Sequence, residues 1–203
     1  LYRAEEFIKV FIHETFHTLG LDFSNMPLTS FNKKVRQLFP INSEFNLFEA
    51  YTEFWASTMN SLISAYLLTE NKDEQNFLIY SDFCCRFEQI FSLFQMVKIL
   101  DFMGLNYQNL FSNDSVSNGV RRYLFKEKSN VFAYYIIKNL LLYFNVDFLI
   151  WCKQHNNNLL TFNKNSSSLN SFLQFIDEKH QNKTFLKDIE KMHEFLKKQN
   201  DFM

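Results

Sequence analysis

Glycine and proline are scarce in this 203-residue chain, which contains only three glycines and two prolines. So few turn-forming residues cannot supply the connections of a many-stranded sandwich or barrel. A strong charge of one sign is also lacking, because the formal net charge is −1, and we expect no nucleic-acid partner. With 47% hydrophobic and 18% aromatic residues, the chain is too apolar for intrinsic disorder. We therefore expect a mainly α-helical fold.

Cysteines and uninterrupted apolar runs are equally scarce. Cys84 and Cys85 are adjacent and Cys152 is distant, a spacing that fits neither a disulfide framework nor a zinc ribbon. We expect reduced thiols in a cytoplasmic or other reducing compartment, and no signal peptide is visible. The most apolar stretch, residues 131–151, is interrupted by Lys138 and Asp147. Charges at membrane depth cost about 2.5–3.5 kcal/mol each, so we expect a buried helix and no membrane span.

The spacing of apolar residues predicts a single domain of successive helices. Residues 2–19 predict a helix that ends at Gly20, and residues 20–45, which hold both prolines, predict a long connection with a short helical turn at 32–38. The Phe-rich stretch 77–102 predicts a core helix. Further helices are expected from Ser43 or Asn46 to Leu67, from Asp73 to Gly104, from Tyr123 onward, at 169–179 and at 185–198, with connections at 105–120 and 154–170.

The first predicted helix contains the motif HExxH at His13, Glu14 and His17. Residues four apart share one helix face, so both imidazoles can bind one zinc ion while Glu14 activates a water held on that ion. The composition of this chain gives roughly 0.008 chance occurrences of the motif. Residues 10–21 are otherwise uncharged, as expected of a buried metal-binding helix. The alternative is a core helix whose two histidines are only hydrogen-bonded.

These residues resemble the zincin metallopeptidases. The stretch from His13 to Ser24 is similar to the metzincin motif HExxHxxGxxH, but Phe23 stands where that family has its third histidine. The stretch Phe48-Glu49-Ala50-Tyr51-Thr52-Glu53 is similar to the glutamate helix of gluzincins. This resemblance implies that Glu49 is the third zinc ligand and that Glu53 orients a ligand histidine. Two alternatives remain, since Glu53 could be the ligand or Glu49 could form a capping box with Asn46.

The resemblance implies a peptidase with one zinc ion, held by His13, His17 and Glu49, with Glu14 as the general base. The substrate would be a peptide or protein. The oxyanion donor stays open among several residues of the C-terminal half, namely Arg121, Arg122, Tyr123, Tyr134, Tyr135 and His155.

Zincins place a β-sheet before the HExxH helix, whereas here only a dozen residues precede His13. The chain is then either the C-terminal part of a larger α+β peptidase or a reduced helical version. We divide its single domain into a metal-site half, 1–70, and a helical C-terminal half, 71–203. The rival hypothesis is a non-catalytic, peptidase-like module with a structural metal site or a partner-binding role.

Overall fold

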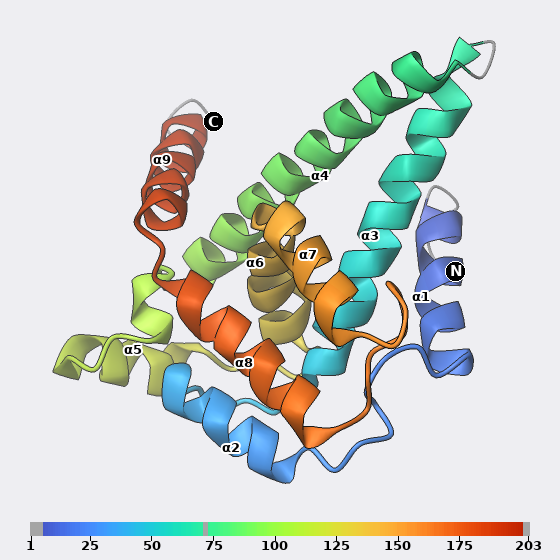
Figure 1. Ribbon diagram of the computed structural model, residues 1–203. Helices are drawn as coiled ribbons and strands as arrows, with labels where there is room; N and C mark the ends of the chain where they lie inside the picture. Colours follow the sequence, from blue (N-terminus) through green and yellow to red (C-terminus); the bar gives the residue numbers. More distant parts are fainter. Residues whose placement is uncertain (1–5, 71–72, 201–203) are drawn as a thin grey trace.

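The computed structural model describes residues 6–70 and 73–200, and every regular element within these ranges is a helix (Figure 1). The expected mainly α-helical fold is therefore confirmed. The elements are α1 (Phe7–Thr18), α2 (Thr29–Leu38), α3 (Leu47–Leu68), α4 (Glu74–Phe102), the 3-10 turn η3 (Gln108–Leu110), α5 (Ser115–Leu124), the π-helix η4 (Phe132–Ile137), α6 (Lys138–Tyr143), α7 (Asn145–His155), α8 (Ser166–His180) and α9 (Lys183–Asn200).

Local signals in the sequence set several of these boundaries. At the end of α1, Gly20 has a φ of 61°, a conformation that glycine adopts without strain. The amide of Gly20 donates to the His17 carbonyl and the amide of Leu21 to the Phe16 carbonyl, which is the Schellman arrangement. At the start of α4, the Asp73 side chain accepts a hydrogen bond from the amide of Asn76. The expected glycine cap of the first helix is thus confirmed, while its expected start at residue 2 lies outside the described residues.

Two connections are more helical than the sequence predicts. The expected short turn at 32–38 is the ten-residue helix α2, and the expected connection at 105–120 contains η3 and the start of α5. In α2 the side chains of Phe31 and Val35 are buried, and the helix packs against α8. Tertiary packing of an apolar face stabilises short helices whose local signals are weak.

The two longest helices, α3 and α4, form a hairpin that organises the molecule (Figure 1). The inner half of the hairpin packs against α1, η4 and α6. Its outer half extends beyond α6 and α7 (Figure 1). One cluster of buried apolar side chains includes residues from both the 1–70 and the 71–203 halves, such as Phe54 and Phe148.

The apolar side chains of the Phe-rich helix α4 are buried only toward its C-terminal end, which corrects the expectation of a core helix. Leu93, Met96, Val97 and Leu100 are buried, whereas Phe83, Phe87 and Ile90 are more than 60% exposed. The physical reason is that the outer half of the hairpin extends past the helices that cover its base. Composition predicts that a helix is apolar, but it does not tell how far the neighbouring helices reach.

No single helix of the described residues is both long and apolar enough to cross a membrane. The stretch Phe132–Tyr143 together with Asn145–His155 meets the length and composition test only as a pair, and the pair is bent by 92°.

Candidate metal site

The site lies where α1 crosses the inner half of α3. The rings of Phe16 and Trp55 stack between these helices, with centroids 6.5 Å apart. Helical spacing places His13 and His17 on one face of α1, one turn apart. Glu49 lies in the first turn of α3. The packing of the two helices brings these three side chains together, although 31 residues separate His17 from Glu49.

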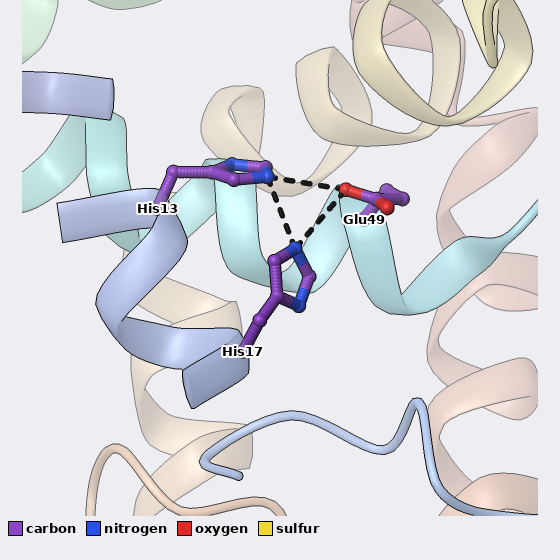
Figure 2. A group of neighbouring side chains, drawn as sticks. All are labelled: His13, His17 and Glu49. Atoms are coloured by element: carbon purple, nitrogen blue, oxygen red, sulfur yellow. Dashed lines mark hydrogen bonds and ion pairs between the residues drawn. The ribbon is translucent and has the colours of Figure 1, made fainter. Parts of the chain in front are cut away.

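Three potential ligand atoms form a nearly equilateral triangle (Figure 2). The Nε2 atoms of His13 and His17 are 3.1 Å apart. The Oε2 atom of Glu49 lies 3.2 Å from Nε2 of His13 and 3.4 Å from Nε2 of His17. Zinc binds such atoms at about 2.0–2.1 Å, and a tetrahedron of that size has edges of about 3.3–3.4 Å. The triangle therefore has the dimensions of one face of a tetrahedral zinc site, with the fourth position open.

Glu53 accepts a hydrogen bond from the His13 ring on the side that faces away from the triangle. Its Oε2 atom lies 3.0 Å from Nδ1 of His13, and its other oxygen forms an ion pair with Lys9. Burial raises the pKa of Glu53, but the hydrogen bond from His13 and the charge of Lys9 outweigh it and lower the pKa to about 2. Glu53 is thus an ionised hydrogen-bond acceptor one turn beyond Glu49, and it does not join the triangle of ligand atoms.

Asp22 does the same for His17, a role that was not predicted from the sequence. Its side chain is fully buried and contacts Nδ1 of His17 through one carboxylate oxygen. The other oxygen accepts a hydrogen bond of 2.7 Å from the amide of Ser24. The turn at Gly20 reverses the chain directly after α1 and so returns Asp22 to the histidine five residues earlier. A signal was present, because an acidic residue just beyond the glycine cap of a helix lies within reach of a histidine in the last turn of that helix.

The two carboxylates fix which nitrogen of each imidazole faces the centre. An ionised carboxylate can only accept hydrogen bonds, so each Nδ1 atom carries a proton and donates it. In the neutral imidazoles both Nε2 atoms then present lone pairs toward Oε2 of Glu49. Three acceptors converge in one place, and such an arrangement requires a cation.

Without a metal ion, a proton can be that cation. Burial lowers the pKa of His13, but the hydrogen bonds to Glu49 and Glu53 outweigh it and raise the pKa to about 9. Burial likewise raises the pKa of Glu49, but the hydrogen bonds from His13 and Tyr134 outweigh it and leave that pKa below its usual value. A metal ion and the proton on His13 must therefore compete for the same position.

Glu49 does not act as a helix cap in this structure. The amide of Asn46, which a capping box would pair with Glu49, donates instead to Oδ1 of Asn130, and the Asn46 side chain makes no capping hydrogen bond. The hydroxyl of Tyr134 donates to Oε2 of Glu49 at 2.8 Å. Tyr134 lies on the π-helix η4, an irregularity that is frequent at functional sites.

A polar cleft of about 430 Å³ opens beside the triangle, and Glu14 lies at its edge. Glu14 is exposed and follows His13 directly in α1. Lys138 also lines this cleft and is only 3% exposed; burial lowers its pKa. Of the three residues of the triangle, His13 lines this cleft, and the side chains of His13, His17 and Glu49 are 12%, 24% and 15% exposed. The remaining lining residues include Lys9, Glu53, Gln95, Tyr134 and Tyr135.

The other candidate oxyanion donors have different surroundings. Tyr135 lines the cleft but has no hydrogen bond to the ligand residues. Arg121 is buried and donates to the carbonyls of Asn109 and Ser112. His155 stacks on Trp151, and Tyr123 is 65% exposed. Among the six, Tyr134 is the one in contact with a residue of the triangle.

Helix α1 is less buried than its uncharged sequence predicts, which is a second correction. Within it Phe16 is buried, whereas Phe11 is 62% exposed. Only the face that carries His13 and His17 is covered, by α3. Two partly buried imidazoles need only one covered face, so an apolar sequence around the motif does not establish a fully buried helix.

No protein-family model matches the chain, and no solved structure matches it. The chain is similar to an uncharacterized protein of Acanthamoeba polyphaga mimivirus, with 32% identity over 110 residues, or 54% of this chain. The matched segment covers 27% of that relative's length. The similarity thus spans about a quarter of the relative.

Proposed function

We propose that the protein is a zinc-dependent metallopeptidase. The observation that carries this proposal is the triangle of Nε2, Nε2 and Oε2 atoms with sides of 3.1, 3.2 and 3.4 Å, set on an HExxH helix. Two imidazoles and one carboxylate with an open fourth position are the donor set of catalytic zinc sites. When bound, zinc lowers the pKa of a coordinated water and polarises the substrate carbonyl.

The residues of this chain then have separate tasks. His13, His17 and Glu49 hold the ion, while Glu53 and Asp22 keep the two imidazoles in the required orientation and tautomer. Glu14, at the edge of the cleft, takes the proton of the attacking water and passes it to the leaving amine. The hydroxyl of Tyr134 lies close enough to the centre to donate a hydrogen bond to the developing oxyanion.

A non-catalytic module with a structural metal site is the second candidate. One observation favours it, because residues 6–70 and 73–200 contain no β-strand that could align a substrate backbone beside α1. A structural site usually has four protein ligands, however, whereas this cluster offers three, one of which, His13, lines a cleft.

Metal analysis combined with one substitution separates these possibilities. We expect one zinc ion per chain in the wild type and in Glu14→Gln, because Glu14 is not a ligand, and a loss of peptidase activity of at least about a thousandfold in Glu14→Gln. Activity would be followed on denatured casein and on a quenched peptide library. Bound zinc without activity in the wild type would indicate the structural site, and bound iron would indicate another chemistry of the same donor set.

The third ligand has its own test. Glu49→Gln is expected to weaken zinc binding more than Glu53→Gln, because Glu49 contributes an atom to the triangle and Glu53 does not. Competition with a chromophoric chelator measures both affinities. The opposite order would identify Glu53 as the ligand.

A further inference from the structure

An apolar stripe runs along the outer half of α4 and faces solvent. It consists of six residues that are 38–64% exposed, and we call it the α4 stripe: Ile79, Tyr80, Phe83, Phe87, Ile90 and Phe91. At 3.6 residues per turn these side chains fall within an arc of about 120°. An arc of this width is typical of a helix that packs against another element.

The spacing of the six stripe residues is the same read in either direction. Ile79 and Phe91, Tyr80 and Ile90, and Phe83 and Phe87 are pairs equidistant from Cys85. Suppose that α4 of a second copy packs antiparallel, with the two Cys85 residues at the same height along the helices. Every apolar residue of the stripe then meets an apolar residue of the other copy. Such a surface is self-complementary about a twofold axis, as an isologous dimer requires.

The spacing of the stripe indicates that its occupant is a helix. Tyr80, Phe83, Phe87 and Ile90 follow intervals of three, four and three residues, which is the seam of a coiled coil. Farther along α4 the same face already holds a helix. There α9 packs against α4, and His193 bonds to Asp101 at 3.0 Å.

The size and charge of the stripe suit a second copy. Its six large side chains are 38–64% exposed, and together they offer a substantial part of the ~800 Å² that each partner contributes to a standard interface. All six residues are uncharged, and Asp82 and Arg86 beside them neutralise each other in an ion pair. A groove of about 900 Å³ between α4 and α9, lined by Phe87, Ile90, Phe91 and Phe195, continues the stripe. In the antiparallel arrangement this groove receives the Tyr80 end of the second helix.

We propose that the α4 stripe is the interface of a homodimer, in which α4 of a second copy packs antiparallel with Phe83 opposite Phe87. This interface is separate from the metal site, since the stripe lies on α4, whereas the three residues of the triangle lie on α1 and in the first turn of α3 (Figure 1). The dimer does not depend on the proposed function.

Sedimentation velocity of the full 203-residue chain over a wide concentration range tests the proposal. We expect a dimer in the wild type, and an association at least about 100-fold weaker in Phe83→Asp/Phe87→Asp, because both central aromatic contacts are lost. Leu78→Asp is the matched control, since Leu78 is 60% exposed on the same helix but outside the stripe. It should remain dimeric. Circular dichroism would verify that all three chains are helical.

A mixing experiment tests the antiparallel register independently. Phe83→Lys and Phe87→Glu should each dimerise poorly alone, and their mixture should form a heterodimer, because the introduced ammonium of one chain then faces the introduced carboxylate of the other. Any of three results would overturn the proposal: a monomeric wild type, an open-ended assembly, or a dimer that survives the double substitution. If the wild type is monomeric, binding of phosphatidylcholine vesicles through the stripe would identify a lipid surface as the occupant.

Discussion

The two halves of α3 distribute charged and apolar side chains in opposite ways. The inner half places Glu49 and Glu53 beside Ala50 and Phe54, which are fully buried. The outer half exposes Leu62, Ile63, Tyr66, Leu67 and Leu68 by 37–68%. Partly buried carboxylates thus lie in the inner half of α3 and large exposed apolar residues in its outer half, against the usual distribution. Each reversal identifies a region that needs something further, a cation in the inner half and a covering surface in the outer half.

The largest expected effect is that of zinc on the free energy of unfolding, which should depend on the inner half of α3 and not on its outer half. If the inner half binds zinc, free zinc at about 1,000 times its dissociation constant should raise the free energy of unfolding by about 4 kcal/mol. The effect should disappear in His17→Ala, which removes one corner of the triangle, and persist in Leu67→Ser in the outer half. Urea unfolding with and without zinc measures it. An equal response in His17→Ala and wild type would contradict the site.

The next effect concerns pH in the metal-free protein. Folding raises the pKa of His13 from 6.5 to about 9, so the resulting stabilisation is complete below pH 6.5 and is lost as pH rises to 9. The loss should be about 3 kcal/mol, since one unit of pKa corresponds to about 1.4 kcal/mol. Urea unfolding in the presence of a chelator at both pH values measures it, with His13→Gln as the control. A pH dependence that is unchanged in His13→Gln would exclude this origin.

A smaller effect is expected from Asp22→Asn. The side chain keeps its size but loses the charge that orients His17, so zinc affinity should fall by about 10–100-fold, or about 1.4–2.7 kcal/mol. Asp82→Asn, an exposed acidic residue on α4, should leave the affinity unchanged. Chelator competition compares the two variants. Equal affinities of Asp22→Asn and the wild type would show that Asp22 has no part in the site.

The smallest effect is expected in the outer half of α3. Leu67 is 68% exposed, so Leu67→Ser should change the free energy of unfolding by no more than about 0.5 kcal/mol. By contrast, Phe54→Ala in the inner half should cost about 3–5 kcal/mol, because a fully buried ring is removed. Urea unfolding at a concentration where the chain is monomeric measures both. A large loss of stability in Leu67→Ser would show that the outer half of α3 is covered within one chain.

Features that depend on neighbours in the sequence could be predicted. The spacing of His13 and His17, the glycine cap at Gly20 and the start of α4 after Asp73 are set within a few residues. The approach of Glu49 was predicted by resemblance, and the physical support for it was that two carboxylates on an apolar helix need a cation.

Features that depend on packing could not be predicted in the same way. Tyr134 reaches Glu49 from 85 residues away, and nothing in its local sequence distinguishes it from Tyr135. The exposure of the α4 stripe depends on how far α6, α7 and α9 extend along the hairpin. The apolar pattern of α4 would be the same if those helices were longer.

The turn at Gly20 also has a consequence for the order of folding. The contacts of Gly20 with His17, of Leu21 with Phe16 and of Asp22 with His17 join residues no more than five apart. Loops this short close early, so the HExxH helix, its cap and its orienting acid can assemble as a unit before α3 arrives. The pattern His-Glu-x-x-His-x-x-Gly-x-Asp is then a ten-residue half of the proposed site that is locally complete, and the arrival of Glu49 marks the docking of the two helices.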